Sequence, residues 1–449
     1  MLAASAPDPA PFYLTALLRG VKVRRDELRV LLIAFAALFC LFTGYASLRP
    51  VRDSLGVAVG TRQLGNLFGW TFIGMLTAMP IFGWLASRFS RRVFLPVIYC
   101  FFIVNLFGFY VLLSRTPHHI FGARLFFVWV SVVNLFIISA FWSLMADLHR
   151  SEQSSRLFGF IAAGGSAGSI VGPALTALLV KRIGNADLLL LAAGFWCVAV
   201  ILVAALLRRP RPDADGAAEP HGEAAAPGLA APAPPEDRPL GGNPLAGIFL
   251  VGKSPYLMGI GLFILLLSAA TTLLYLQQAA LLSHAVPDPT DRTRLLAALD
   301  TAVNILSLLL QLLVVGRLTV RIGVAGVLLA VPAVLVLGFL VLALAPALSV
   351  LIGLMLVRRV GEYGLLRPSR EVLFTSVDRP TKYKAKSFID TVIYRGADWL
   401  NAKLHELLVA LGLSTSGIAL GGAAVAAAWA VVGFWLGRRH ASGRAAQGS

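Results

Sequence analysis

A short segment of the chain places six charged side chains in an otherwise apolar stretch. Residues 358–371 read RRVGEYGLLRPSRE and follow the apolar run 348–357. Its charged residues are Arg358, Arg359, Glu362, Arg367, Arg370 and Glu371. At the centre of a membrane each charge costs roughly 2.5–3.5 kcal/mol on insertion scales. These side chains are therefore expected to face a water-filled cavity or one another.

The most telling part of this segment occurs a second time near the start of the chain. Residues 48–53 read LRPVRD and residues 366–371 read LRPSRE, and each copy ends an apolar run. Arginine side chains bind phosphate and carboxylate oxygens through paired hydrogen bonds. We therefore predict an anion site in which Arg52 and Arg370 make the main contacts, with Arg49, Arg367 and Arg395 as further contacts.

The composition indicates which elements hold these residues. The chain has 449 residues, 58% of them hydrophobic and 14% charged, with a mean hydropathy of +0.80. Such an apolar chain is expected to be an all-α polytopic membrane protein. About twelve runs are long enough to cross a bilayer with a core of about 30 Å. They lie at 30–48, 64–86, 93–113, 121–145, 157–180 and 188–207, and at 256–282, 295–318, 324–345, 348–372, 388–411 and 417–436.

A polar segment divides these runs into two sets of six. Residues 208–240 are rich in Ala, Pro and Gly and have almost no large apolar side chains, which is typical of disorder. We expect an N-terminal segment (1–28), a six-helix bundle (29–207), a disordered linker (208–252), a second six-helix bundle (253–437) and a tail (438–449). Two pseudo-symmetric bundles favour a binding site at their interface, near the middle of the membrane.

The formal net charge of +17 is explained by membrane topology. Lys and Arg gather in alternate loops, at 19–29, 88–92, 208–211, 317–321, 382–386 and 438–439. Because cytoplasmic loops are enriched in Lys and Arg, both termini and the linker are expected in the cytoplasm, with the chain in a bacterial inner membrane. The expected partners are the lipid bilayer and a small anionic solute, not nucleic acid, and the protein is expected to be monomeric.

The sequence contains no pattern typical of an enzyme. Its three cysteines, Cys40, Cys100 and Cys197, lie within apolar runs and suit neither a disulfide framework nor a metal site. The sequence also has no metal-ligand cluster, nucleophile motif or phosphate-binding loop. We therefore expect a protein that is not an enzyme and has no metal or cofactor.

Carboxylates accompany the arginines and are candidates for coupling or gating. They are Asp53, Asp300, Glu362, Glu371, Asp390 and Asp398. Arg49 and Asp53 are four residues apart, as are Arg367 and Glu371, so each pair could meet on one helix face. An incoming anion could then replace the carboxylate at the guanidinium group, which would favour exchange. The alternative is that each pair permanently braces a bend at the neighbouring proline.

Two segments resemble motifs of the major facilitator superfamily. Residues 83–92 read GWLASRFSRR, which is similar to the loop G-x-L-a-D-r-x-G-R-[RK] of that superfamily, although Ser87 and Ser90 replace its Asp and Gly. Small residues before Pro173, at Gly159, Gly168 and Gly172, resemble part of a motif of its antiporters. Close helix packing explains these glycines equally simply, and we favour that interpretation.

A narrower resemblance is carried by residues 362–390. EYGLLRPSRE, followed by Val377-Asp378 and by KAKSFID at 384–390, resembles the pattern K-Y-x-L-F-D-P-T-K-E, L-D, K-x-K-x-x-I-D of the ATP/ADP translocase family. Residues 48–53 resemble the first-helix motif of the same family, L-R-x-x-K-D. The resemblance implies a facilitator-type fold and exchange of a nucleotide-like anion. The chain departs from the family at Arg367, which stands in the place of an Asp, and at Asp398, which stands in the place of a Lys.

Two functions remain open at this point. The first is a secondary active transporter that exchanges an anionic solute, either nucleotide-like or another phosphorylated or carboxylated metabolite. The second is a proton-coupled facilitator that exports an organic metabolite or drug, in which a buried acid such as Asp53, Asp300, Glu362 or Glu371 takes the proton. Exchange would show as stimulation of uptake by solute on the far side, and proton coupling as a need for a pH gradient.

Overall fold

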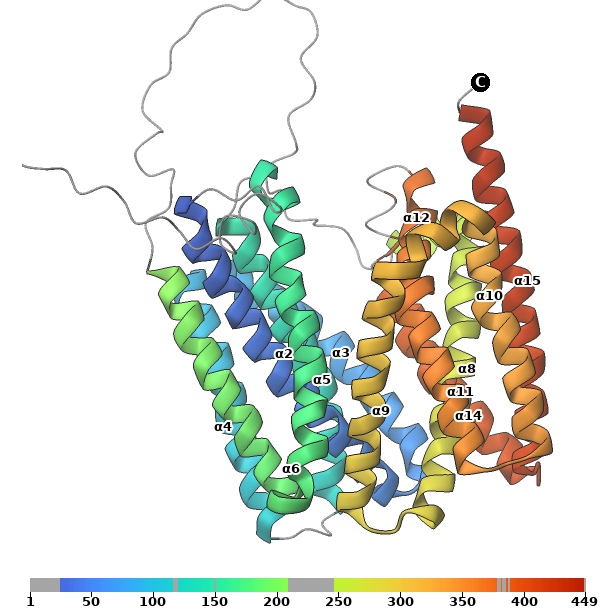
Figure 1. Cartoon of the computed structure of the whole chain (residues 1–449), viewed down its shortest axis with the longest axis horizontal. Coiled ribbons are helices and arrows are strands. Elements are labelled where there is room, and N and C mark those ends of the chain that lie inside the picture. Colours follow the sequence, from blue (N-terminus) through green and yellow to red (C-terminus); the bar gives the residue numbers. More distant parts are fainter. Residues whose placement is uncertain are drawn as a thin grey trace, which may run out of the picture.

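The computed structural model describes residues 25–115, 120–148, 151–208, 246–377, 381, 385–386 and 388–447, and all regular elements in these ranges are helical. Most of the expected linker, together with Asp378 and Lys384, lies outside the described residues. Figure 1 shows two groups of long helices standing side by side. The N-terminal group contains α2 (Arg25–Val59), α3 (Thr61–Arg88), α4 (Arg91–Arg115), α5 (Ile120–Leu148) and α6 (Ser151–Leu207).

The second group begins with a short helix and contains three stretches wound more widely than an α-helix. Its α-helices are α7 (Ala246–Lys253), α8 (Pro255–Ala285), α9 (Pro289–Leu310), α10 (Gly316–Leu344), α11 (Leu348–Gly361), α12 (Arg367–Leu373), α14 (Tyr394–Ala410) and α15 (Thr415–Gln447). The π-helical stretches are η1 (Gln311–Val315), η2 (Glu362–Leu366) and η4 (Ile389–Ile393), and a 3₁₀ turn, η3 (Phe374–Ser376), follows α12. The sequence had predicted one helix over 348–372, where the structure has α11, η2 and α12.

The helices account for the twelve predicted membrane spans. Among the described residues, eight helices are long and apolar enough to cross a membrane. Two of them exceed one span and break at a glycine with positive φ, Gly184 at 80° and Gly323 at 66°, so each supplies two spans. Glycine adopts this backbone conformation without the steric cost that a Cβ would add. The two remaining spans, α11 to α12 and η4 to α14, carry most of the charged residues of the predicted site.

A row of glycines sets the packing of α6 on α2. A Cβ at Gly164, Gly168 or Gly172 would collide with a backbone carbonyl of α2. Hydroxyl groups add polar contacts across the same interface, because Thr176 Oγ1 donates to the Ser47 carbonyl at 3.2 Å. Close approach of this kind is how small residues hold membrane helices together. The structure therefore agrees with the packing interpretation at Gly168 and Gly172, whereas Gly159 has open space around it.

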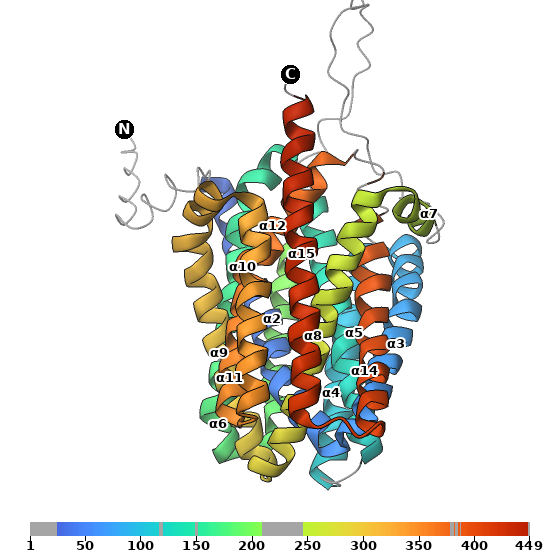
Figure 2. The same cartoon turned by 90° about the vertical axis from the view of Figure 1, so that its right-hand side faces the viewer.

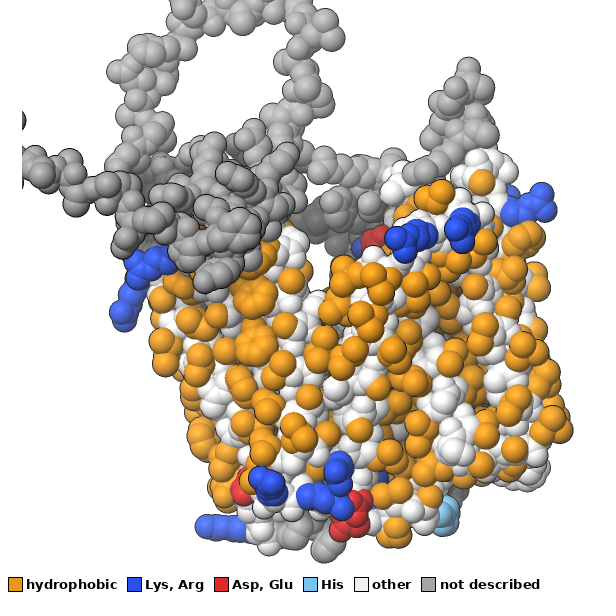
Figure 3. Space-filling view, viewed as in Figure 1, with side chains coloured by type: hydrophobic (Ala, Val, Ile, Leu, Met, Phe, Trp, Pro, Cys, Tyr) orange, Lys and Arg blue, Asp and Glu red, His pale blue; other side chains and the backbone are white. Residues whose placement is uncertain are grey.

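Apolar side chains form both the interior and the outer surface. One cluster of buried apolar residues lies mainly in the N-terminal bundle, and the second lies wholly within residues 251–436. Figure 3 shows hydrophobic side chains covering most of the visible face, with Lys and Arg gathered toward its two ends. An apolar belt between charged rims is what a bilayer requires of the surface it contacts.

Candidate functional site

Both copies of the repeated motif face one cavity between the two bundles. The cavity has a volume of about 1140 Å³, and its walls come from both bundles. All the site residues predicted from the sequence line it: Arg49, Arg52, Asp53, Asp300, Glu362, Arg367, Arg370, Glu371, Asp390, Arg395 and Asp398. Two further arginines, Arg358 and Arg359, also line the cavity. The arginines therefore outnumber the carboxylates by one.

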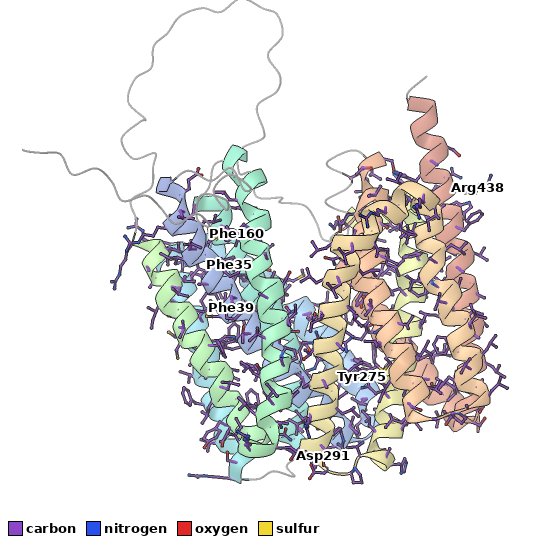
Figure 4. The ribbon with its side chains drawn as sticks, viewed as in Figure 1. Phe35, Phe39, Phe160, Tyr275, Asp291 and Arg438 are labelled. Carbon is purple, nitrogen blue, oxygen red and sulfur yellow. The ribbon has the colours of Figure 1, made fainter. Side chains whose placement is uncertain are left out.

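A group of polar contacts joins the two bundles at one end of the molecule. Ser54 Oγ on α2 donates to the Pro289 carbonyl at 3.0 Å, and Arg292 Nη1 on α9 donates to the Ser54 carbonyl at 3.2 Å. Lys181 of α6 forms an ion pair of 2.6 Å with Asp291 of α9. Figure 4 shows Asp291 at the end opposite the chain's C-terminus. We refer to these contacts as the closed end.

The turn before α9 supports the closed end. Asp288 caps the helix, since its Oδ1 accepts hydrogen bonds of 2.8 Å from the N–H groups of Thr290 and Asp291. These bonds favour the ionised carboxylate and lower the pKa of Asp288. Arg292 folds back on the same turn and donates to the Pro287 carbonyl at 3.0 Å. The cavity reaches Gln311, beside the start of α10, at the opposite end.

Two ion pairs are buried in the wall of the C-terminal bundle. Arg359 of α11 contacts Asp300 of α9 at 2.5 Å, and Arg358 contacts Glu362 at 2.7 Å. Every one of these side chains is less than a tenth exposed. Arg358 also donates to Thr271 Oγ1 of α8 at 2.9 Å. These bonds tie α11 to α8 and α9, so they hold the wall in place.

Arg52 has partners on α2 and α5, and its partner Asp53 also bonds α8. Its Nε and Nη2 both donate to Asp53 Oδ1, at 2.9 and 2.6 Å, and Nη1 donates to Ser131 Oγ of α5 at 3.3 Å. The guanidinium lies 5.0 Å from the centre of the Phe127 ring, within the range of a cation–π contact. Tyr275 of α8 donates to the same Asp53 oxygen at 3.0 Å.

The remaining pairs lie on α12, η4 and α14. Arg370 pairs with Asp390 at 3.3 Å, and Glu371 pairs with Lys386 at 2.6 Å. Arg395 meets Asp398 at 3.4 Å, as their spacing of three residues predicted, and Lys403 likewise meets Glu406 at 2.8 Å. Asp398 also accepts a hydrogen bond of 2.7 Å from Ser268 Oγ of α8.

The two pairs expected at a spacing of four residues are not those that form, so that prediction was wrong. Asp53 forms its ion pair with Arg52 instead of Arg49, and Glu371 forms its ion pair with Lys386 instead of Arg367. Helix side chains lean toward the N-terminus, so Arg367 turns back along η2, away from Glu371. In a π-helix residues five apart share a face, and Arg367 accordingly meets Glu362, at 3.7 Å.

Positive charge is left over at Arg49 and Arg367. Arg49 has no ion pair among the described residues, whereas Arg367 has only the 3.7 Å contact and is 59% exposed. Arg367 also stacks on the Tyr363 ring at 4.4 Å. Both arginines carry the same charge and line the same cavity as Tyr363. They hold matching positions in the two motif copies, one in each bundle.

Several cavity residues escaped the sequence reasoning. Tyr275 and Thr271 lie in the apolar run of α8, and Ser131 and Phe127 lie in that of α5. Residues 268–278, SAATTLLYLQQ, do carry an unusual number of polar side chains for a membrane span. That polar stripe was the available signal. Ser131 and Phe127 gave none, because isolated serines and aromatic residues are common in membrane helices.

Residues 30–369, about three quarters of the chain, match the Major Facilitator Superfamily. The chain belongs to this superfamily. This facilitator is accordingly a transporter of some solute. No curated protein matches its sequence, so the narrower likeness to ATP/ADP translocases stays a prediction.

Solved facilitator structures have the same fold. The nucleoside transporter NupG is 12% identical with a TM-score of 0.61, and the alignment covers 92% of this chain and 99% of that one. The POT family transporter PepTSo is 13% identical with a TM-score of 0.63, covering 92% and 98%. A bacterial homologue of ferroportin in an inward-facing state is 15% identical with a TM-score of 0.61, covering 92% and 100%. At these identities the likeness establishes the fold alone.

Proposed function

We propose that this facilitator carries an anionic solute by exchange and binds its anionic group between Arg49 and Arg367. The observation that carries the proposal is the position of these two arginines, on α2 and α12 of opposite bundles. Among the described residues Arg49 has no ion pair there, and Arg367 has only the 3.7 Å contact with Glu362. An arginine without a close counter-ion in a membrane cavity keeps an electrostatic cost that an anion would remove. Guanidinium groups also match the oxygen geometry of phosphate and carboxylate.

The charge balance around Tyr363 favours a solute with two negative charges. Four arginines, at positions 49, 358, 359 and 367, surround two carboxylates, Asp300 and Glu362, in this part of the cavity. The excess of two positive charges matches a phosphate monoester. Aromatic side chains on the same walls, such as Tyr45, Phe68 and Tyr394, could hold a planar ring, which would suit a nucleotide-like solute.

Repulsion between the two arginines supports exchange over one-way transport. Closing the cavity would bring α2 and α12 together, and in the empty carrier the two like charges of Arg49 and Arg367 would approach across a medium of low dielectric constant. A bound anion would neutralise both arginines and remove the free-energy cost of bringing them together. The loaded carrier would then reorient faster than the empty one, which is the condition for exchange.

The orientation belongs to the same proposal. Basic residues at the end of α7, the start of α10 and the last part of α15 lie away from the closed end. They are Lys253, Arg317, Arg321, Arg438 and Arg439. By the rule that positive loops are cytoplasmic, the cavity faces the cytoplasm of a bacterial inner membrane and both termini lie inside. The proposal also includes two six-helix bundles at 29–207 and 253–437, a linker at 208–252 and a monomeric state.

Transport in liposomes tests the proposal. The purified chain is reconstituted with unlabelled solute inside, and uptake of labelled nucleotides, sugar phosphates, dicarboxylates and neutral nucleosides is measured. We expect uptake of a phosphorylated solute that rises at least severalfold when the same solute is inside. Uptake of neutral solutes alone would contradict the anion site.

A pH gradient separates exchange from proton coupling. Asp398 favours the second mechanism, because its shortest hydrogen bond, of 2.7 Å, comes from the neutral Ser268 hydroxyl and its contact with Arg395 is longer, at 3.4 Å. Transport that requires a pH gradient and ignores internal solute would identify a proton-coupled exporter or importer. Exchange predicts that the gradient has little effect.

A further inference from the structure

A second pocket lies outside the transport cavity, at the end of the molecule that carries the C-terminus. It has a volume of about 1150 Å³ and lies between the start of α8, the end of α15 and the segment after α12. Figure 2 shows α7 beside the start of α8 at this same end. The lining of the second pocket includes three basic residues, Lys253, Arg438 and Arg439.

The three cations have no carboxylate partner. Among the described residues, none of Lys253, Arg438 and Arg439 forms an ion pair, and all three are exposed. Among the residues that the structure describes, no acidic side chain lines the pocket. This is the opposite of the transport cavity, where nearly every arginine has a carboxylate. A pocket with this charge is complementary to an anionic group.

Aromatic rings hold the two arginines at the edge of the apolar surface. Arg438 lies 5.7 Å from the centre of the Phe434 ring and Arg439 lies 5.6 Å from that of Trp435, and both distances are in the range of cation–π contacts. Figure 4 shows Arg438 on the outer side of α15 near its end. Residues 415–442 form a candidate membrane span, so the arginines lie close to a membrane–water boundary.

Apolar side chains continue from the pocket along the outside of the bundle. Val431, one turn before Trp435 on α15, is 68% exposed and lines the same pocket. Phe249 of the adjoining α7 is 69% exposed. A free phosphate would use the cations alone, whereas a phospholipid would use the cations for its headgroup and this apolar surface for an acyl chain.

We infer that this pocket binds the headgroup of an anionic phospholipid through Lys253, Arg438 and Arg439. An acyl chain lies over Val431, Phe434 and Trp435. The pocket wall includes Ser376 and Val377, which follow the helix that carries Arg370 and Glu371. Tyr256, another lining residue, donates to the Leu373 carbonyl of that helix at 3.0 Å. The lipid therefore contacts a segment continuous with the rim of the transport cavity.

Native mass spectrometry of the full chain in detergent measures the binding. The probes are phosphatidylglycerol, phosphatidylcholine and inorganic phosphate, each titrated onto the protein. The test variant combines Lys253→Gln, Arg438→Gln and Arg439→Gln. The matched control combines Arg88→Gln, Arg317→Gln and Arg321→Gln, which removes three exposed cations from the end of α3 and the start of α10.

Phosphatidylglycerol is expected to bind the unmodified chain and the control variant with equal affinity and the test variant roughly 100-fold more weakly. This estimate rests on about 1 kcal/mol per basic residue near an anionic surface. Phosphatidylcholine should bind at least tenfold more weakly than phosphatidylglycerol. Equal loss in both variants would show that total charge, not this pocket, attracts the lipid. If inorganic phosphate binds as tightly as phosphatidylglycerol, the ligand of this pocket is a free anion and not a lipid.

Trp435→Leu separates the lipid site from a misfolding effect. It keeps all three cations and an apolar side chain but removes the ring beneath Arg439. A severalfold loss of phosphatidylglycerol affinity is expected. If the triple variant does not fold and Trp435→Leu binds the lipid normally, the proposal is wrong.

Discussion

Tyr275 and Asp53 join the two bundles next to the closed end of the cavity. The Tyr275 hydroxyl of α8 donates to Asp53 Oδ1 of α2 at 3.0 Å. The same oxygen accepts both hydrogen bonds from Arg52, so one carboxylate links the motif of the first bundle to a helix of the second. Opening this end of the molecule requires that the bond breaks, which makes it part of the gate.

Tyr275→Phe should therefore favour the state that opens at the closed end. A hydrogen bond to a charged group contributes about 1.5–3 kcal/mol, so the population of that state should rise about tenfold or more. Spin labels placed on the first turns of α9 and the last turn of α2 would report the change as longer distances. The control is Tyr256→Phe, which removes a bond of equal length within the C-terminal half. Equal distance distributions in the two variants would exclude Tyr275 from the gate.

Arg49→Gln and Arg367→Gln should each abolish accumulation of the anionic solute while leaving the protein folded. Arg49 has no ion pair among the described residues, and Glu362, which Arg367 meets at 3.7 Å, keeps its 2.7 Å pair with Arg358, so neither change leaves a buried acid unpaired. We expect solute affinity to fall at least tenfold, measured by equilibrium binding. The comparison variant is Arg317→Gln, which changes an exposed arginine outside the cavity. Normal transport by both cavity variants would assign the site to Arg52 and Arg370, as the sequence alone suggested.

Asp300→Asn and Glu371→Gln should differ in their effect on stability. Asp300 neutralises buried Arg359, so its loss leaves a buried charge unpaired and should cost about 3–5 kcal/mol. Glu371 pairs with Lys386 where both side chains are partly exposed, and its loss should cost less than about 1 kcal/mol. Thermal unfolding in detergent would show a large drop in Tm for the first variant only. A comparable drop for Glu371→Gln would mean that Glu371 braces the helix after all.

Gly168→Ala should destabilise the N-terminal bundle, and Gly159→Ala should not. The added methyl group at Gly168 would lie 2.5 Å from the Phe39 carbonyl oxygen of α2, whereas Gly159 has open space around it. Overpacking of this kind costs about 1–3 kcal/mol. Replacing an exposed helical glycine by alanine instead gains roughly 0.5–1 kcal/mol. We expect Tm to fall for Gly168→Ala and to rise for Gly159→Ala. A fall in Tm for both variants would mean that alanine destabilises α6 wherever it is placed.

The sequence by itself determined the membrane fold and the charged residues of the cavity. Hydropathy runs and the polar segment after residue 208 predicted twelve spans in two halves, because a bilayer imposes length and polarity on each helix separately. The repeated LRPxR-acid motif identified both cavity walls, since charges in hydrocarbon are retained only where they face water or each other. Pairs set by local helical spacing, such as Arg395 with Asp398, were also predictable.

Only the tertiary structure decided which arginines are neutralised. Arg52 is occupied because α5 and α8 bring Ser131 and Tyr275 to its motif, and neither helix could be placed beside α2 from the sequence. The π-helical turn at 362–366 then sets Arg367 against Glu362 instead of Glu371. Ion pairing depends on distances of a few ångströms between helices and on one extra residue in a turn. Hydropathy and spacing along the chain carry no information about either quantity.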